Sequence, residues 1–155
     1  MTQVAYRSRT RLAVVLLLVS SLAFTGFATD QARAGERTRN RAEMLQLTNG
    51  ARDREGLRAL ELDRQLSRYA FRHSRAMADD GELFHSENLA ALLGARDWSM
   101  GGENVGYAAS LSDLQAAFMR STPHRGNILR RGYDRTAIGV VQSDGNFWVT
   151  VIFYG

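Results

Sequence analysis

The final stretch of the chain constrains the fold more than any other feature, because it predicts a strand that is apolar on both faces. Its alternate residues form two sets, Phe147, Val149, Val151 and Phe153 on one face and Trp148, Thr150, Ile152 and Tyr154 on the other. A strand of this kind must be covered on both sides. The sequence therefore predicts a sheet that lies between two layers.

A second apolar and β-branched segment, Ala137–Val141, precedes this strand, and Ser143-Asp144-Gly145-Asn146 joins the two. Two such runs around an Asp-Gly turn predict an antiparallel β-hairpin. Helices elsewhere in the chain can cover both faces of the sheet. We therefore expect an α+β fold, a three-layer α-β-α sandwich around a small, mostly antiparallel sheet.

Apolar residues at helical spacing predict two helices in the first half of the chain. One covers Thr38–Arg54 and ends at Gly56, after charged residues 35–41 that we expect to be frayed. Asp63 is a good N-cap for the other, which ends at Asp79-Asp80-Gly81. The apolar stripe of this second helix consists of Leu66, Tyr69, Ala70, His73 and Met77.

The segment between the second helix and the hairpin has a more broken pattern. Residues 82–102 look irregular, with a short helix around residues 87–93, and residues 105–108 predict a short strand. Ser112 and Gln115 form a capping box that begins a third helix, preceded by Leu111 as a staple residue. A short helix through Leu129 then starts with Thr122 as N-cap and Pro123 as first residue. The apolar face of the third helix holds Leu114, Ala117 and Phe118.

The first 34 residues have the layout of a secretory signal peptide. Arg7, Arg9 and Arg11 form a positive start, an apolar run follows over residues 12–24, and Ala32-Arg33-Ala34 offers a cleavage site. The apolar run is shorter than the roughly 20 residues of a membrane span, although an uncleaved anchor is the alternative. We expect residues 1–34 to be removed, leaving one secreted, extracellular domain over residues 35–155 with no stable membrane span.

The composition limits how this domain is held together and what it binds. The chain has no cysteine, so packing alone must stabilise the exported domain. Of its 20 basic and 16 acidic residues, four arginines and one aspartate lie in residues 1–34, and the rest are nearly balanced and interspersed. A nucleic-acid-binding domain shows a clustered basic excess, so we expect no nucleic-acid partner.

Two histidines lie where they can contribute to a site. His124 follows Pro123 in the first turn of the short helix, where the positive helix end favours a neutral imidazole, the form that binds a metal. Local capping or packing is the alternative role for His124. His85 follows Phe84 in a loop, where its ring can turn into a cleft or remain at the surface. His73 lies on an apolar helix stripe, and we expect it to be structural.

Glu103 lies in the Gly-rich segment 101–105, just ahead of the predicted short strand. Its carboxylate can accept a hydrogen bond from an imidazole and fix the tautomer of that ring. Alternatively, it stabilises the turn by accepting from backbone amides. Asn104, Arg125 and Asn127 are expected to hold neighbouring backbone rather than to contact a substrate.

Several ordered motifs extend over residues 41–155. The earlier ones are Asn49-x-x-Arg52, Gly56-Leu57-x-x-Leu60, Asp63-x-x-Leu66 and His73-Ser74-x-x-Met77-Ala78. The later ones are His85, Gly102-Glu103-Asn104-Val105, Phe118-x-x-Ser121-x-x-His124-Arg125-x-Asn127-Ile128-Leu129, Ile138-Gly139-Val140 and Trp148-Val149-Thr150. In this order they resemble the CAP superfamily, whose SCP domain is shared by cysteine-rich secretory proteins, venom antigens and plant pathogenesis-related proteins. The chain is most similar to the short, secreted bacterial members.

The resemblance implies an α-β-α sandwich with a cleft lined by two histidines and two glutamates. By motif match, His85 and His124 would be the histidines that bind a metal such as zinc, and Glu103 would be one glutamate. Ser121 stands where the family has the second glutamate, so this cleft lacks one carboxylate. Two histidines alone make a weak zinc site, in which water or a ligand would fill the remaining positions.

These residues are consistent with several functions, of which we favour a secreted binding module with optional zinc. Its unknown extracellular ligand would be a lipid, a protein or a cell-wall component, as the resemblance implies. The alternative is a metal-dependent hydrolase of an extracellular or cell-wall substrate, with Glu103 as candidate catalytic base. A nucleophilic triad of Ser121, His124 and Glu103 is a further enzymatic hypothesis. The last alternative is a scaffold, in which the polar residues merely hold the cleft together.

Overall fold

The computed structural model describes the backbone of residues 10–155 and the side chains from residue 30 onward. The chain divides into two compact units, residues 1–36 and 37–155. Helix α1 covers Thr10–Arg54, so residues 35–41 are helical and the prediction that they are frayed is wrong. Nothing in this segment stops a helix, because the chain's single proline is Pro123 and arginine and glutamate are good helix formers.

The predicted export signal is described only in part. Two of the three arginines of its positive start, Arg7 and Arg9, lie outside the described residues, and only the backbone of Arg11 is described. The signal, its cleavage after Ala34 and the domain boundary at that point stay predictions. Among the residues that the structure describes, no helix is both long and apolar enough to cross a membrane.

The sheet of the second unit has four strands in the order β1-β3-β4-β2. β1 (Glu61–Leu62) pairs in parallel with β3 (Arg135–Ser143). β4 (Asn146–Tyr154) lies between β3 and β2 (Gly101–Ala108) and is antiparallel to both. The predicted hairpin is therefore present as β3 and β4, and both residues of its Asp-Gly turn have positive φ, as a tight two-residue turn requires.

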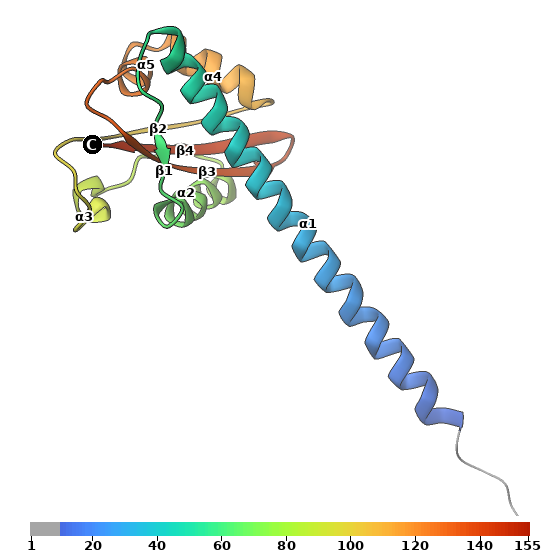
Figure 1. The fold of residues 1–155 in the computed structure, drawn as a ribbon. Helices are drawn as coiled ribbons and strands as arrows, with labels where there is room; N and C mark the ends of the chain where they lie inside the picture. The colour runs from blue at the N-terminus through green and yellow to red at the C-terminus, as the bar shows by residue number, and fades with distance from the viewer. Residues whose placement is uncertain (1–9) are drawn as a thin grey trace, which may run out of the picture. The chain divides into compact units, whose positions relative to one another are not determined.

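Helices cover both faces of the sheet, as Figure 1 shows. One layer contains α4 (Leu111–Arg120), α5 (Thr122–Ile128) and the part of α1 that belongs to the second unit. The other layer contains α2 (Leu66–Asp80) and α3 (Leu89–Leu93). The three-layer α-β-α sandwich predicted from the sequence is confirmed.

The two apolar faces of β4 explain why both layers form. Val149, Val151 and Phe153 are buried in a core shared with Met44 of α1 and Phe118 of α4. The other face of the strand packs against the opposite layer, where Ile152 and Tyr154 contact the cluster of Leu66, Ala70 and Leu93. Because burial of apolar side chains on both faces drives the fold, the strand has no free apolar face.

Several local predictions were wrong by one or a few residues. Thr122 is the first residue of α5 and not its N-cap, a position that Ser121 occupies without a side-chain cap hydrogen bond. Helix α4 is capped by Ser110, whose Oγ accepts a hydrogen bond from the Asp113 amide at 3.1 Å, and not by Ser112. Gln115 consequently lies on the buried face of α4, whereas Ala117 is exposed. Strand β2 begins at residue 101 rather than 105, because the whole Gly-rich segment pairs with β4.

The buried side chain of Arg52 connects α1 to the chain that follows α5. Its Nη1 donates hydrogen bonds to the carbonyl oxygens of Ile128 and Arg130, at 2.9 and 3.0 Å. Its Nη2 donates to Tyr133 O at 3.0 Å, and its Nε to Arg58 O at 2.8 Å. Four backbone carbonyls thus surround one guanidinium and fix the end of α5 against α1.

Candidate functional site

Glu103 and Asn104 are neighbours on the edge strand β2, and they point to opposite faces of the sheet. The register places Glu103 beside Ile152 and therefore on the α2 side, and Asn104 beside Val151 on the α5 side. Side chains alternate along a strand. An edge strand can therefore connect groups from both layers into one site.

The Glu103 carboxylate holds the loop that carries His85. Its Oε2 contacts His85 Nδ1 at 2.8 Å and accepts from the Ser86 amide at 2.9 Å, while its Oε1 accepts from Ser86 Oγ at 2.6 Å. The Glu103 side chain is 5% exposed and that of His85 is 61% exposed. The carboxylate therefore orients the histidine ring from inside, and the rest of the ring faces solvent. Ser86 was missed in the sequence, although it directly follows His85.

Two amide side chains, the buried Asn104 and the half-buried Asn127, fix α5 against the other side of β2. Asn104 Nδ2 donates to the carbonyl oxygen of His124 at 3.0 Å. Asn127 Nδ2 donates to Asn104 Oδ1 at 2.9 Å and to Glu103 O at 3.1 Å. A Cβ atom at Gly102 would lie 2.7 Å from Asn127 Oδ1, so a glycine is needed for this approach. The structural role predicted for Asn104 and Asn127 agrees with these contacts.

The His124 ring packs between α4 and the start of α5. Its Nδ1 lies 2.8 Å from Ser121 Oγ, and its ring centroid lies 5.0 Å from that of Phe118. Burial lowers the pKa of His124, and the nearby His85 lowers it further. The ring is therefore neutral near pH 7.

The structure does not assemble the Ser121–His124–Glu103 triad. Ser121 does contact His124, but the Glu103 carboxylate is bonded to His85 and Ser86 instead. His124 therefore lacks the carboxylate that would orient it as a base for a serine nucleophile. His85 contributes to the electrostatic environment of His124, because a charge on His85 would lower the pKa of His124.

His85 and His124 offer the same kind of metal-ligating atom. Each uses Nδ1 in a hydrogen bond within the protein, and neither Nε2 has a partner among the described residues. Metal-ligating histidines are commonly oriented through their other ring nitrogen, so the orientation of each ring is compatible with a role as a metal ligand. No group of three or more His, Asp or Glu side chains within the described part of the chain is arranged to hold one. Further ligands of a zinc ion would therefore be water or ligand atoms.

A cavity of about 450 Å³ adjoins His85 on the α2 side. Its walls come from Tyr69 and His73 of α2, from residues 84–88, and from Leu92 of α3. His73 is buried, as predicted, and its Nδ1 lies 3.0 Å from Thr150 Oγ1. Neither Glu103 nor His124 lines this cavity.

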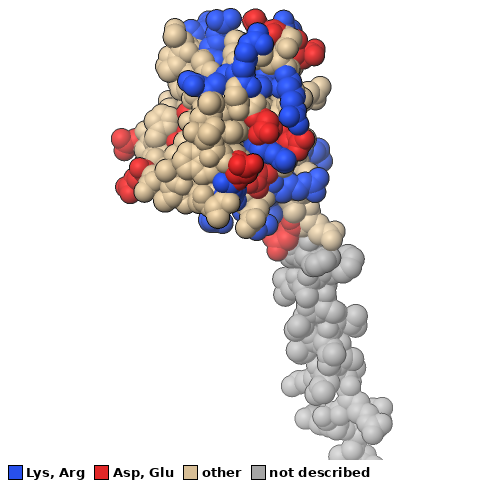
Figure 2. Space-filling view, turned by 60° about the vertical axis from the view of Figure 1, so that its left-hand side comes forward, with Lys and Arg blue, Asp and Glu red and all other residues tan. Residues whose placement is uncertain are grey.

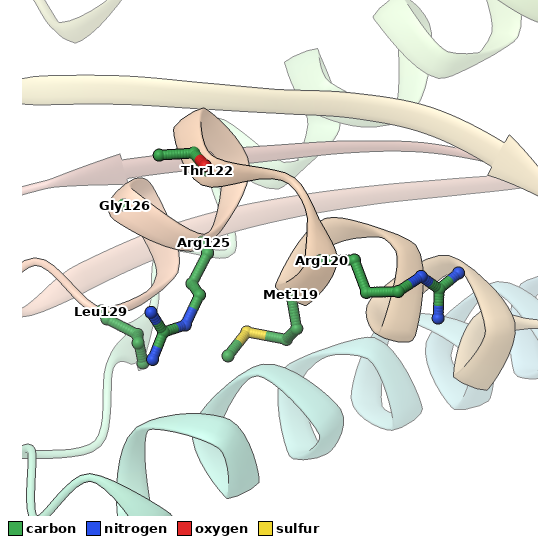
Figure 3. Close-up of a pocket in the computed structure, with 6 residues that line it drawn as sticks. All are labelled: Met119, Arg120, Thr122, Arg125, Gly126 and Leu129. Atoms are coloured by element: carbon green, nitrogen blue, oxygen red, sulfur yellow. The ribbon is translucent and has the colours of Figure 1, made fainter.

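A second hollow, of about 590 Å³, lies between α4 and α5. Figure 3 shows Arg125 and Met119 extending toward the same space, whereas Arg120 extends away from it. Arg125 pairs with Glu55 at 3.5 Å, and not with backbone as predicted. The hollow is lined by none of the predicted metal or cleft residues, so the larger of these two spaces is not the candidate site.

Charges of both signs lie side by side on the second unit. Figure 2 shows basic and acidic atoms next to each other on the face in view. The ion pairs agree with this distribution, because Arg135 and Arg58 both contact Glu61, at 2.8 and 3.5 Å. The absence of a nucleic-acid partner stays a prediction.

A family model, described as the cysteine-rich secretory protein family and abbreviated CAP, matches residues 45–153. The chain belongs to the CAP family. The match covers α2 to α5, all four strands and the positions of His85, Glu103 and His124. It establishes the family and leaves the roles of these side chains as predictions.

Three bacterial proteins are similar to this CAP domain. It is 28% identical over 114 residues to YkwD, an uncharacterized protein of Bacillus subtilis, covering 68% of this chain and 44% of YkwD. It is 30% identical over 112 residues to YlbC, an uncharacterized membrane protein of the same organism, covering 66% of this chain and 32% of YlbC. An extracellular SCP-domain protein of Bacillus anthracis is 28% identical with a TM-score of 0.62, over 76% of this chain and 41% of that one. The chain thus spans less than half the length of each.

Proposed function

We propose that this CAP domain is a secreted binding module, and that its ligand-binding face is the edge of the sheet around His85, Glu103 and His124. The observation that carries the proposal is that both histidines use Nδ1 internally, while neither Nε2 has a partner in the part of the chain that the structure describes. An imidazole that is held through Nδ1 presents Nε2 as its ligating nitrogen, as in many metal sites. The lowered pKa of His124 supports the proposal, because a neutral ring needs to lose no proton before it binds.

Zinc in this site would bind with modest affinity, because the protein supplies two nitrogen ligands. The remaining positions would accept oxygen atoms from an extracellular ligand, whether lipid, protein or cell-wall component. The metal would supply a positive charge that attracts such oxygens. Glu103 would keep the His85 ring in place. The extracellular protein of Bacillus anthracis supports secretion of this chain as part of the proposal.

The metal-dependent hydrolase is supported less well by the geometry. A general base must reach a water molecule at the reacting centre. The Glu103 side chain is only 5% exposed, and its two oxygens already take part in three hydrogen bonds to His85 and Ser86. These contacts favour a positioning role for Glu103.

Zinc titration calorimetry on the protein and on a His85→Ala/His124→Ala variant tests the proposal. We expect one zinc site in the protein and none in the double variant, with unchanged circular dichroism. His73→Asn is the matched control, because it removes a third imidazole and should leave zinc binding intact. Equal zinc binding by the double variant would refute the site. Turnover of an ester or peptidoglycan substrate that a chelator abolishes would favour the hydrolase instead.

A further inference from the structure

The cavity beside α2 contains a buried nitrogen that no protein group satisfies. His73 is 8% exposed, and its Nε2 is buried without a hydrogen-bond partner among the described residues. The opposite nitrogen, Nδ1, lies 3.0 Å from Thr150 Oγ1, which in turn contacts Ser74 Oγ at 3.0 Å. An unsatisfied buried polar atom is destabilising, and in a native fold it indicates strain, a missing water or a missing ligand.

Aromatic side chains surround this nitrogen. The Tyr69 ring stacks on His73, with centroids 5.9 Å apart, and the Phe84 ring meets it edge-on at 5.1 Å. Leu92 completes an apolar wall. Polar and more exposed side chains, among them Glu87 and Asn88, line the rest of the cavity. The cavity therefore has an aromatic interior with one unpaired nitrogen and a polar mouth.

We propose that this cavity binds a small aromatic alcohol, whose hydroxyl group pairs with Nε2 of His73. A hydroxyl group both donates and accepts a hydrogen bond. It therefore matches His73 whichever tautomer the contact with Thr150 selects. The aromatic ring matches walls formed by Tyr69 and Phe84. A volume of about 450 Å³ also falls within the usual range of small-molecule sites, about 300 to 1,000 Å³.

Phe84 is the more exposed of the two aromatic walls of this cavity. It is 37% exposed and belongs to a loop without helix or strand, next to the equally exposed Leu83. The side chain that can adapt to a ligand therefore belongs to neither α2 nor the sheet. The cavity shares only His85 with the proposed metal site, so the two proposals can fail independently.

Titration of 4-methylphenol into the ¹⁵N-labelled full chain, followed by side-chain ¹⁵N NMR, tests the proposal. We expect a saturable shift of the His73 Nε2 resonance. The matched variants are His73→Asn, whose amide replaces Nδ1 but not Nε2, and His73→Gln, whose amide reaches the position of Nε2. Affinity should fall about tenfold or more in His73→Asn and be largely kept in His73→Gln. Equal affinity in both variants would overturn the proposal.

Two further variants keep the test decisive if a His73 substitution prevents folding. Leu92→Trp fills the cavity from α3 without touching His73, and it should abolish the shift. His85→Ala removes a proposed zinc ligand, and it should leave 4-methylphenol binding intact while weakening zinc binding. No saturable shift in the unaltered protein, or a shift that persists in Leu92→Trp, would show that the cavity holds water alone or that the alcohol binds elsewhere.

Discussion

Replacement of Arg52 by methionine should destabilise the domain strongly, although Arg52 forms no ion pair with a carboxylate among the described side chains. The side chain is 1% exposed and donates to four carbonyl oxygens, of which those of Ile128 and Tyr133 are buried. Each buried carbonyl left unpaired costs about 1–3 kcal/mol. The carbonyls of Arg58 and Arg130 are partly buried and can regain water. We therefore expect Arg52→Met to lower the free energy of unfolding by about 3–5 kcal/mol.

Urea unfolding followed by circular dichroism measures this loss. Arg54→Met is the matched control, because Arg54 is exposed in the last turn of the same helix, and its loss should cost less than about 1 kcal/mol. A buried charge can sometimes be replaced by an apolar side chain at no cost. A loss below about 1 kcal/mol for Arg52→Met would therefore refute the view that the four carbonyls depend on this guanidinium.

Three other predictions concern the site and the packing around it. Glu103→Gln should weaken zinc binding about tenfold in calorimetry because the orientation of His85 is lost; unchanged affinity would contradict the positioning role. Burial lowers the pKa of His73 below 6.5, so the unfolded chain binds more protons than the folded one as the pH falls through that value. The free energy of unfolding should therefore fall between about pH 7 and pH 5, and fall less in His73→Gln; identical pH profiles in urea unfolding would count against this. Gly139→Ala should cost about 3 kcal/mol or more because its Cβ atom would lie 2.1 Å from the Ala70 carbonyl carbon. Gly126→Ala, with open space around the new methyl group, should be neutral or stabilising when both variants are compared by urea unfolding.

The parts of the fold that follow from local patterns could be predicted from the sequence. The period of two in β4 predicted two covering layers, and both are present. Asp63 was predicted to cap α2, and its Oδ1 accepts from the Leu66 amide at 2.8 Å. The cap of α4 was misplaced because Ser110 and Ser112 are each followed by a polar residue three positions later. Only burial of Leu111 and Gln115 in the assembled core distinguishes the two positions.

The extent of β2 could not be predicted, because glycine is uncommon in strands. A Cβ atom at Gly101 would lie 2.8 Å from Leu93 Cδ1, and one at Gly102 would lie 2.6 Å from the Tyr133 hydroxyl. These contacts come from distant parts of the chain. They explain why a segment that looks like a turn pairs along its whole length with β4.

In the candidate site, too, local sequence suggested the role of a residue, whereas contacts between residues far apart in the chain could not be predicted. Residue type and context suggested that Glu103 could orient an imidazole, and the structure brings it to His85, 18 positions away. The unsatisfied nitrogen of His73 could not be foreseen. It depends on Thr150, which is 77 positions away, and on the edge of the Phe84 ring. The spacing of apolar residues along α2, which includes His73, predicts neither of these contacts.

Side-chain ¹⁵N NMR of the three histidines during a zinc titration tests the central claim most directly. The account predicts that zinc shifts the Nε2 resonances of His85 and His124 together, with one saturation point, and leaves that of His73 unchanged. A shift at His73, a shift at only one of His85 and His124, or no shift at either would contradict the proposal that these two rings form one metal-binding face.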